Sequence, residues 1–355
     1  MKEVTFIIAY LGIGGAERVI SVLANEFVKS GIKVNIITTN SPEVVYDLDK
    51  RINYIYLGID GSNRIINIFK RILRLRKTLN SIRGKKVIVF LHKPIILTVL
   101  ATIFTDKELY FSERNNPYME PTSKFQRFIR DLAYNFGKKI IFQTKDARNY
   151  FKESIRKKGY IIPNPIKTDL PKPFIGERKK TIVSVCRLNQ QKNIKMLIDA
   201  YALLEKLHPE YNVIIYGEGE LRKELEEYII KLGLKDKIEL PGFEKEVHNK
   251  IINCYMYVSS SNYEGISNSM IESLAIGLPT IVTDCPIGGA RATIKNGENG
   301  VLVKVGDVKG LYEAMKNVIE DKEFAKKISK NSIKINDDLN PKNISNMWLK
   351  VIELE

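Results

Sequence analysis

Short apolar runs alternate with longer stretches of helical period along most of the chain. The runs are rich in Val, Ile and Phe, and in the longer stretches apolar residues recur at steps of three and four. In the first half the pattern predicts strands at 3–9, 33–38, 52–57, 86–91, 108–112, 139–143 and 159–162. It predicts helices at 15–29, 64–83, 94–104, 122–136 and 145–157. This alternation is typical of parallel sheets joined by crossover helices.

A proline-rich segment, 163–173, interrupts the alternation and is the best interdomain linker, because proline continues neither a helix nor a central strand. Beyond it we expect strands at 181–186, 212–216, 237–240, 255–259, 279–283 and 301–303. Helices are expected at 193–207, 219–232, 245–253, 267–276, 308–319, 322–334 and 341–354, and the last contains Trp348. Two α/β domains in series are predicted, each doubly wound like a Rossmann domain, with a cleft between the carboxyl ends of their strands.

Composition places the chain among ordinary globular proteins of two domains. It has 355 residues, 44% of them apolar, and no apolar run approaches a membrane span. Its cysteines, Cys186, Cys254 and Cys285, lack the spacing of a disulfide framework or a metal site, so a reducing compartment fits best. The first residues are interpreted as a strand rather than a signal peptide. We therefore expect a soluble, cytoplasmic protein.

The net charge of +16 is concentrated in the first half of the chain. Residues 1–170 carry 30 Lys and Arg against 15 Asp and Glu, whereas the remainder carries 27 against 26. This asymmetry predicts an anionic partner for the first half: a membrane surface, a phosphorylated lipid or nucleic acid. The cations lack interleaved aromatic residues and no recognition motif accompanies them, so nucleic acid is not favoured.

A glycine turn at Gly12, Gly14 and Gly15 follows the first strand and opens a helix. Such a turn lets a phosphate approach backbone N–H groups at the positive end of the helix. The alternative is a tight strand–helix turn that needs glycine for its own geometry. The spacing is neither a dinucleotide fingerprint nor a P-loop.

Two cations, Arg187 and Lys192, lie in the loop after the first strand of the second half. At the end of a parallel strand they can hold a diphosphate and neutralise the charge that grows on it as a bonded sugar leaves. The alternative is a pair of solvated surface cations.

The segment Glu264-Gly-Ile-Ser-Asn-Ser-Met-Ile-Glu272 is the most informative of the chain. It runs from a loop into a helix, so backbone N–H groups at the helix start would face an anion. Carboxylates at both ends can accept hydrogen bonds from sugar hydroxyls. Alternatively, Glu272 forms a capping box with Ser269.

Asp47 and Asp49 have the spacing of the Asp-x-Asp motif that binds metal in some enzymes. The pair is interpreted as a surface turn, and no metal requirement is expected.

Together these motifs make the sequence similar to the retaining glycosyltransferases of family 4. The similarity spans nearly the whole chain: Gly14-Gly15-Ala16-Glu17-Arg18, Ser112-Glu113-Arg114-Asn115-Asn116-Pro117, the Arg187/Lys192 loop, Gly217-Glu218-Gly219, Glu264 to Glu272, and Asn296-Gly297-Glu298-Asn299-Gly300. The resemblance implies a GT-B fold with an acceptor domain at 1–165 and a nucleotide-sugar domain at 175–340. The helix at 341–355 would cross back onto the first domain.

The resemblance also implies roles for these residues. Arg187 and Lys192 would bind the donor diphosphate, Glu264 the transferred sugar and Glu272 the ribose. Main-chain groups of Gly265, Ile266, Ser267 and Asn268 would complete the phosphate site. The sequence departs from the family at two points. Glu113 and Arg114 occupy a loop where many members place a histidine, for which His92 is a possible substitute, and Ala292 replaces a frequent glutamate.

The helix at 64–83 is amphipathic and strongly basic. Its apolar residues form one stripe: Ile65, Ile68, Ile72, Leu75, Leu79 and Ile82. Lys70, Arg74 and Lys77 follow another face, and no acidic residue occurs from 63 to 87. The stripe is expected to pack on the core, and the cations to bind a lipid-linked diphosphate or anionic headgroups. Similarity to enzymes that extend undecaprenyl diphosphate-linked glycans suggests such an acceptor, with the enzyme peripheral to the cytoplasmic face of the membrane.

The resulting hypothesis is that the protein transfers a hexose or N-acetylhexosamine from a nucleoside diphosphate sugar to a lipid-linked or soluble glycan, with retention of the anomeric configuration. The resemblance favours UDP as the nucleotide. No cofactor is expected beyond this donor. Alternatives are a sugar-nucleotide epimerase, or an inverting transferase with Glu113 or His92 as general base. A non-catalytic sugar-nucleotide-binding regulator and a basic nucleic-acid- or membrane-binding protein are the non-enzyme alternatives.

Overall fold

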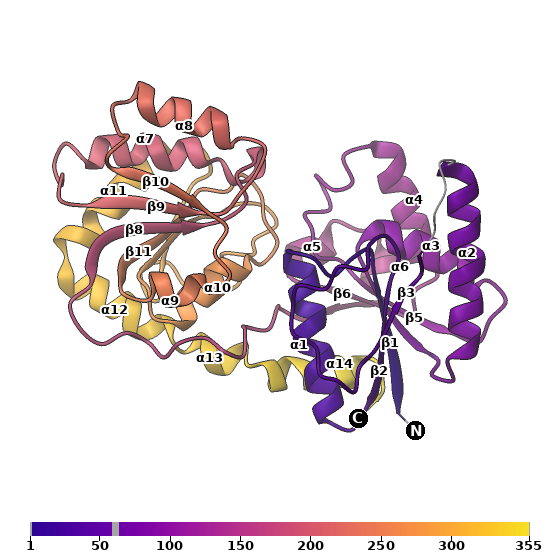
Figure 1. Ribbon diagram of the computed structural model, residues 1–355. Coiled ribbons are helices and arrows are strands. Elements are labelled where there is room, and N and C mark those ends of the chain that lie inside the picture. The colour runs from indigo at the N-terminus through magenta and orange to yellow at the C-terminus, as the bar shows by residue number, and fades with distance from the viewer. Residues whose placement is uncertain (1, 59–63, 355) are drawn as a thin grey trace. The chain divides into compact units, whose positions relative to one another are not determined.

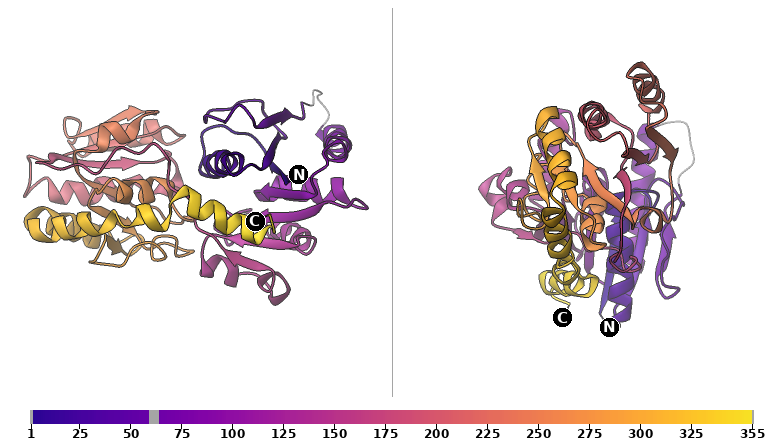
Figure 2. Two further views of the ribbon diagram at one scale, coloured as in Figure 1. Left: turned by 90° about the horizontal axis from the view of Figure 1, so that it is seen from below. Right: turned by 90° about the vertical axis from the view of Figure 1, so that its left-hand side faces the viewer.

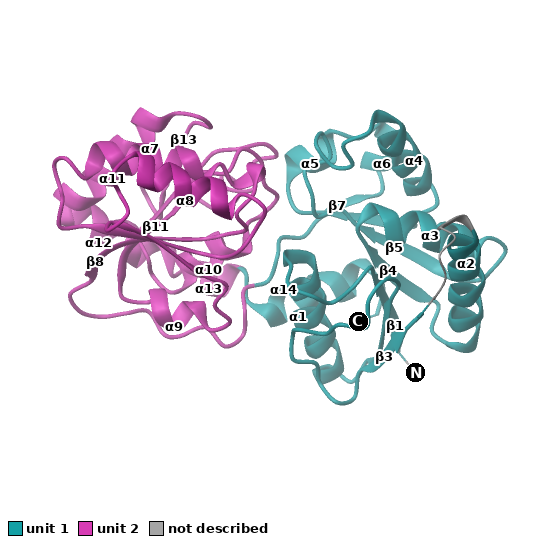
Figure 3. Cartoon of the chain, turned by 45° about the horizontal axis from the view of Figure 1, so that its top comes forward, with its two compact units in different colours: residues 1–165, 339–355 teal, residues 166–338 magenta. Residues whose placement is uncertain are grey.

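The computed structural model describes residues 2–58 and 64–354, which form two compact units (Figure 1). Unit 1 comprises Met1–Pro165 and Leu339–Glu355, and unit 2 comprises Ile166–Asp338 (Figure 3). The chain passes from unit 1 to unit 2 within the proline-rich segment 163–173. Within the described ranges, no helix has the length and apolar character needed to cross a bilayer.

Unit 1 is built on a seven-stranded sheet in the order β3-β2-β1-β4-β5-β6-β7. All neighbouring strands are parallel. The strands are β1 (Glu3–Ile8), β2 (Lys33–Thr38), β3 (Asn53–Tyr56), β4 (Lys86–Phe90), β5 (Glu108–Ser112), β6 (Lys139–Phe142) and β7 (Gly159–Ile161). The central strands are buried on both faces, which accounts for their continuous rather than alternating apolar sequences.

Helices cover both faces of this sheet, as the views in Figures 1 and 2 show. On one face α1 packs against α14, and on the other α3 contacts both α2 and α4. The helices of unit 1 are α1 (Gly15–Lys29), α2 (Arg64–Ser81), α3 (His92–Thr102), α4 (Lys124–Tyr134), α5 (Lys145–Asn149), α6 (Glu153–Arg156) and α14 (Pro341–Val351). The two faces follow from right-handed crossovers that run in opposite directions from β1 and β4.

The C-terminal helix α14 belongs to the core of unit 1. Trp348 is fully buried, and its ring stacks on Phe90 of β4 with 5.8 Å between centroids. Asn340 caps the helix by accepting from the backbone N–H of Lys342, and Pro341 occupies its first turn. The resemblance-based expectation that this helix returns to the first domain is confirmed.

Unit 2 contains a six-stranded parallel sheet in the order β10-β9-β8-β11-β12-β13. Its strands are β8 (Lys179–Val185), β9 (Asn212–Tyr216), β10 (Ile238–Gly242), β11 (Cys254–Ser259), β12 (Thr280–Thr283) and β13 (Val301–Val303). Its helices are the 3₁₀ helix η1 (Gln190–Lys192), α7 (Ile194–Leu204), α8 (Arg222–Lys231), α9 (Val247–Ile251), α10 (Asn268–Ala275), α11 (Val308–Glu320), α12 (Lys322–Ser332) and α13 (Ile335–Asp338).

The main departure from the expected elements is at 145–157. The single helix predicted there is wrong: α5 and α6 are separate, and Lys152 has an extended backbone. At the break lies Phe151, whose ring is buried among those of Tyr134, Phe142 and Tyr150. The interruption of the helix thus coincides with the packing of this side chain into an aromatic cluster. The short helix α13 was not predicted.

Candidate functional site

The first part of the site is the loop that leads from β8 into η1. Asn189 accepts a hydrogen bond from the backbone N–H of Lys192 (3.3 Å) and so caps η1. Ser260, after β11, donates to the carbonyl oxygens of Lys192 (3.1 Å) and Asn193 (2.9 Å). The backbone of Lys192 is therefore held by two neighbouring strand ends, while Arg187 is exposed at the carboxyl end of β8.

A glycine turn packs tightly against this loop. Gly217 has φ 136°, and a Cβ atom there would collide with the carbonyl oxygen of Cys186. The backbone N–H of Leu188 donates to the carbonyl oxygen of Glu218 at 2.9 Å. Glycine is required at 217 both for its positive φ and for this close approach, so the turn fixes the backbone on which Arg187 is carried.

The second part of the site is the loop from β11 to α10. Ser267 caps α10, because its hydroxyl accepts from the backbone N–H of Met270 (3.4 Å). The loop is held from outside: the N–H of Glu264 donates to the Pro286 carbonyl (3.1 Å), and the N–H of Ile287 donates back to the Glu264 carbonyl (3.2 Å). Gly289 packs against Gly265 so closely that no side chain would fit. Gly265, Ile266, Ser267 and Asn268 thus form a rigid turn at the amino-terminal end of α10.

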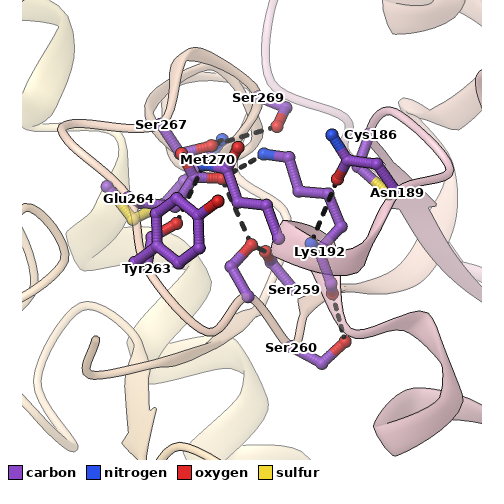
Figure 4. Close-up of polar contacts among 12 residues, drawn as sticks. Cys186, Asn189, Lys192, Ser259, Ser260, Tyr263, Glu264, Ser267, Ser269 and Met270 are labelled. Carbon is purple, nitrogen blue, oxygen red and sulfur yellow. Dashed lines mark hydrogen bonds and ion pairs between the residues drawn. The ribbon is translucent and has the colours of Figure 1, made fainter. Parts of the chain in front are cut away.

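Lys192 and Glu264 meet where these two loops converge (Figure 4). The Lys192 ammonium forms an ion pair with Oε1 of Glu264, and both side chains are mostly buried. Ser261 donates to the same oxygen (3.2 Å), and Gln191 donates to Oε2 (3.3 Å). Burial opposes the charged lysine, but the Glu264 carboxylate outweighs it and raises the pKa of Lys192 above its usual value. Lys192 is therefore held in its charged form beside Glu264, which lies in the loop that leads into α10.

Glu272 lies deeper, on α10, and contacts a residue that sequence analysis missed. Only 2% of Glu272 is exposed, and its Oε2 lies 2.9 Å from Nε2 of His248 on α9. The capping-box alternative for Glu272 is wrong, because Ser267 rather than Ser269 is the cap residue. The separation of 24 positions between His248 and Glu272 gave no spacing signal. The topology could have found His248, since α9 and α10 flank the same strand, β11, on one face of the sheet.

The candidate residues of unit 1 occupy different surroundings. Gly14 is held by Tyr46, whose hydroxyl donates to the Gly14 carbonyl (2.9 Å), and the buried Glu17 carboxylate packs against the Gly14 backbone. A carboxylate already lies at the start of α1, so a phosphate at Gly14 and Gly15 would meet a like charge. The geometry favours the tight-turn alternative for these two glycines.

Glu113 and Arg114 follow β5 but point into the protein. Glu113 is 5% exposed and accepts from the Tyr134 hydroxyl (2.7 Å), and burial raises its pKa. Arg114 donates to Asn164 (2.8 Å), and its guanidinium lies over the rings of Phe90 and Trp348. Burial lowers the pKa of Arg114 to about 9. Arg114 thus joins α14 to the sheet and Glu113 contacts α4, and neither set of contacts favours direct contact with an acceptor.

His92 and the α2 cations are the unit 1 candidates that remain accessible. His92 is the first residue of α3, and burial together with Lys93 and Arg130 lowers its pKa to about 4, so its imidazole is neutral near pH 7. Lys70, Arg74 and Lys77 are exposed, and Arg74 also donates to the Leu57 carbonyl (2.5 Å). The side chain of Ile65 lies outside the described residues.

The expected apolar stripe of α2 is only partly buried. Leu75, Leu79 and Ile82 pack on the core, but Ile68 is 43% exposed. The expectation that the whole stripe packs on the core is therefore wrong at Ile68, in the first half of the helix.

Comparison with known proteins identifies the architecture and the kind of enzyme. The family described as Glycosyltransferase Family 4 matches residues 13–170, and the family described as Glycosyl transferases group 1 matches residues 165–335. The chain belongs to glycosyltransferase family 4. The resemblance inferred from the motifs is confirmed, and with it the assignment of the chain as a transferase enzyme. The non-enzyme alternatives are thereby set aside.

Two relatives and one solved structure show which glycosyltransferases this chain is similar to. It is 29% identical to the GalNAc-alpha-(1->4)-GalNAc-alpha-(1->3)-diNAcBac-PP-undecaprenol alpha-1,4-N-acetyl-D-galactosaminyltransferase of Campylobacter jejuni, over 99% of this chain and 98% of the relative. It is also 29% identical to the N-acetylgalactosamine-N,N'-diacetylbacillosaminyl-diphospho-undecaprenol 4-alpha-N-acetylgalactosaminyltransferase of the same organism, over 92% of each. The structure of Anabaena HepE with UDP and glucose superposes with a TM-score of 0.84 at 16% identity, over 99% of this chain and 100% of HepE. The fold is GT-B, as expected.

Proposed function

We propose that this glycosyltransferase moves a hexose or N-acetylhexosamine from a UDP-sugar to a lipid-linked glycan with retention of the anomeric configuration. The observation that carries the donor site is the convergence of Lys192 and Glu264 at the amino-terminal end of α10. The Lys192 cation and the row of backbone N–H groups at the start of α10 suit the diphosphate of such a donor. The Glu264 carboxylate suits the hydroxyl groups of its sugar.

The roles in the reaction follow from this arrangement. A diphosphate at the start of α10 would take over the Lys192 ammonium, with Arg187 as a second cation, and release the Glu264 carboxylate to accept hydrogen bonds from sugar hydroxyls. As the bond between the anomeric carbon and the phosphate oxygen breaks, negative charge grows on the diphosphate, where the two cations and the helix dipole stabilise it. Glu272, oriented by His248, would hold the ribose.

Retention needs the acceptor to attack from the side that the diphosphate leaves. In a same-face displacement the acceptor oxygen bonds to the anomeric carbon and gives its proton to the departing phosphate oxygen, so no enzymatic base is required. Glu113 is buried against Tyr134 and is poorly placed to serve as the base of an inverting reaction. We propose no metal requirement, since Lys192 and Arg187 can carry out the charge neutralisation of a divalent ion.

The acceptor part of the proposal rests on unit 1 and on the Campylobacter relatives, whose names specify undecaprenol-linked glycans. Lys70, Arg74 and Lys77 of α2 offer three exposed cations to a lipid-linked diphosphate. Cys186, Cys254 and Cys285 are free thiols, which fits a location at the cytoplasmic face of a membrane.

The proposal is tested by incubating the enzyme with UDP-, GDP- and ADP-sugars and a polyprenyl diphosphate-linked glycan, with and without EDTA. We expect transfer from a UDP-hexose or UDP-N-acetylhexosamine, unchanged by EDTA. The product's anomeric configuration, measured by NMR, should equal that of the donor. An inverted product, or transfer that EDTA abolishes, would refute the mechanism.

A further inference from the structure

Helix α4 exposes three of its apolar residues to solvent and buries an arginine in the core. Phe125, Phe128 and Leu132 recur at steps of three and four and are 71%, 61% and 51% exposed. On the opposite side Arg130 is fully buried, together with Ala133 and Tyr134. A helix that covers a sheet usually buries its large apolar side chains and exposes its charged ones, so three exposed apolar residues beside a buried arginine are unusual.

The contacts of Arg130 fix this orientation. Its guanidinium donates to the carbonyl oxygens of Pro117 (3.2 Å) and Glu120 (2.8 Å) and pairs with Asp131 (2.8 Å). It also lies over the ring of Phe151 at 4.8 Å. Rotating α4 to bury its phenylalanines would remove these partners from a buried charge, which is costly. The exposed apolar face is thus built into the fold.

The first half of α2 exposes a second apolar row. Ile66, Phe69 and Leu73 are 50%, 64% and 67% exposed. Both α2 and α4 contact α3, which lies between them (Figures 1 and 3). Because crossover helices run antiparallel to the strands, the first turns of α2 and α4 lie at the same edge of the unit 1 sheet, where the strands end. We call Ile66, Phe69, Leu73, Phe125, Phe128 and Leu132 the docking surface.

Cations accompany the docking surface on both helices. Lys70, Arg74 and Lys77 follow the row next to the apolar residues of α2, and Lys124 begins α4. The nearest acidic side chain on α4, Asp131, is already paired with Arg130. Exposed aromatic and aliphatic side chains flanked by Lys and Arg are what a protein needs to enter the interface of an anionic bilayer.

We propose that the docking surface inserts into the headgroup region of an anionic lipid membrane. The apolar side chains of α2 and α4 supply burial, and the neighbouring cations supply attraction to the headgroups. This inference rests on the proposed function and deepens it. The membrane contact sets the carboxyl ends of the unit 1 strands against the bilayer, from which a lipid-linked acceptor would come. A bilayer fits better than a protein partner because Lys70, Arg74, Lys77 and Lys124 flank the surface, and the acidic side chain of α4, Asp131, is paired with Arg130.

The test is co-sedimentation of the full chain with vesicles of phosphatidylcholine alone or mixed with phosphatidylglycerol. We expect binding to the mixed vesicles that weakens but persists as salt is raised, since salt screens only the electrostatic part. The variant Phe125→Ser/Phe128→Ser should bind at least about tenfold more weakly. The matched control, Leu207→Ser/Ile230→Ser, removes two exposed apolar side chains of unit 2 and should bind as the wild type does.

The same proteins are also assayed for the rise in melting temperature that UDP produces, which reports a folded unit 2, and by circular dichroism for overall folding. Equal vesicle binding by the Phe125→Ser/Phe128→Ser variant and the wild type would overturn the inference. The inference would also be overturned if the wild type did not bind the vesicles, or if it self-associated with rising concentration instead of binding them. A UDP response without vesicle binding would refute the docking surface alone, and vesicle binding without a UDP response would refute the donor site alone.

Discussion

The two units have similar sheets but use their charged residues in opposite ways. In unit 2 charged groups converge on one another at the carboxyl ends of the strands: Lys192 pairs with Glu264, and His248 contacts Glu272. In unit 1 two buried charges, Arg114 and Arg130, hold helices in place, while three exposed cations, Lys70, Arg74 and Lys77, lie along α2. A small polar ligand suits the first arrangement, and an extended anionic surface suits the second.

The largest effect is expected from the core of unit 1. Trp348→Ala removes a fully buried ring that stacks on Phe90, and should lower the free energy of unfolding by about 3–5 kcal/mol. The measurement is urea denaturation, with Met347→Ala, which is 41% exposed, as the matched control. A change of less than about 1 kcal/mol would show that α14 is not part of the unit 1 core.

In unit 2, loss of Lys192 should affect the reaction rather than the fold. Lys192→Ala removes one charge from the departing diphosphate and leaves Glu264 facing it, so kcat/KM should fall about 10²–10³-fold. The control is Lys195→Ala, an exposed lysine of α7 that pairs with Glu224. Activity of Lys192→Ala within a factor of about three of the wild type would remove Lys192 from the donor site.

A smaller effect is expected from His248, which we regard as a positioning residue for Glu272. His248→Ala should raise KM for the UDP-sugar about tenfold with little change in kcat, because a buried carboxylate loses a hydrogen-bond partner that orients it. His248→Gln, which can still donate, should restore much of the affinity. The neighbouring exposed Asn249→Ala is the control. Equal loss of kcat and of affinity, with no rescue by Gln, would indicate a structural role instead.

The smallest effect is expected from the outer surface of unit 1. Replacing Lys70, Arg74 and Lys77 together by Gln should raise KM for a lipid-linked acceptor by about fivefold to tenfold at low salt, and less at high salt. UDP binding should stay unchanged. Gln replacements of Lys223, Lys231 and Lys235, exposed cations of unit 2, provide the control. A salt-independent effect would contradict an electrostatic role for the three cations.

The sequence predicted most of what depends on local patterns. Strand and helix positions, the linker and the Lys192 and Glu264 loops followed from apolar runs, proline and position at strand ends. What it did not predict depends on contacts between distant segments. Phe151 packs against the rings of Tyr134 and Phe142, which come from two other segments, and Arg130 fixes the rotation of α4 through carbonyl groups in the preceding loop.

The same limit applies to the candidate site. The sequence led to the prediction that Glu264 and Lys192 bind the donor, but their pairing with each other, and that of His248 with Glu272, required the fold. Glu113 and Arg114 were candidates because the resemblance places them in a loop where many members of the family have a histidine, and in the structure both side chains are buried.

The central claim is that unit 2 binds a nucleoside diphosphate through Lys192. The most direct measurement is the melting temperature of the full chain with and without UDP, in the absence of added metal. A ligand that binds only the folded state raises this temperature. We predict a rise for the wild type and for Lys195→Ala that is lost in Lys192→Ala. No rise with UDP in well-folded wild-type protein, or an equal rise in Lys192→Ala, would contradict the account.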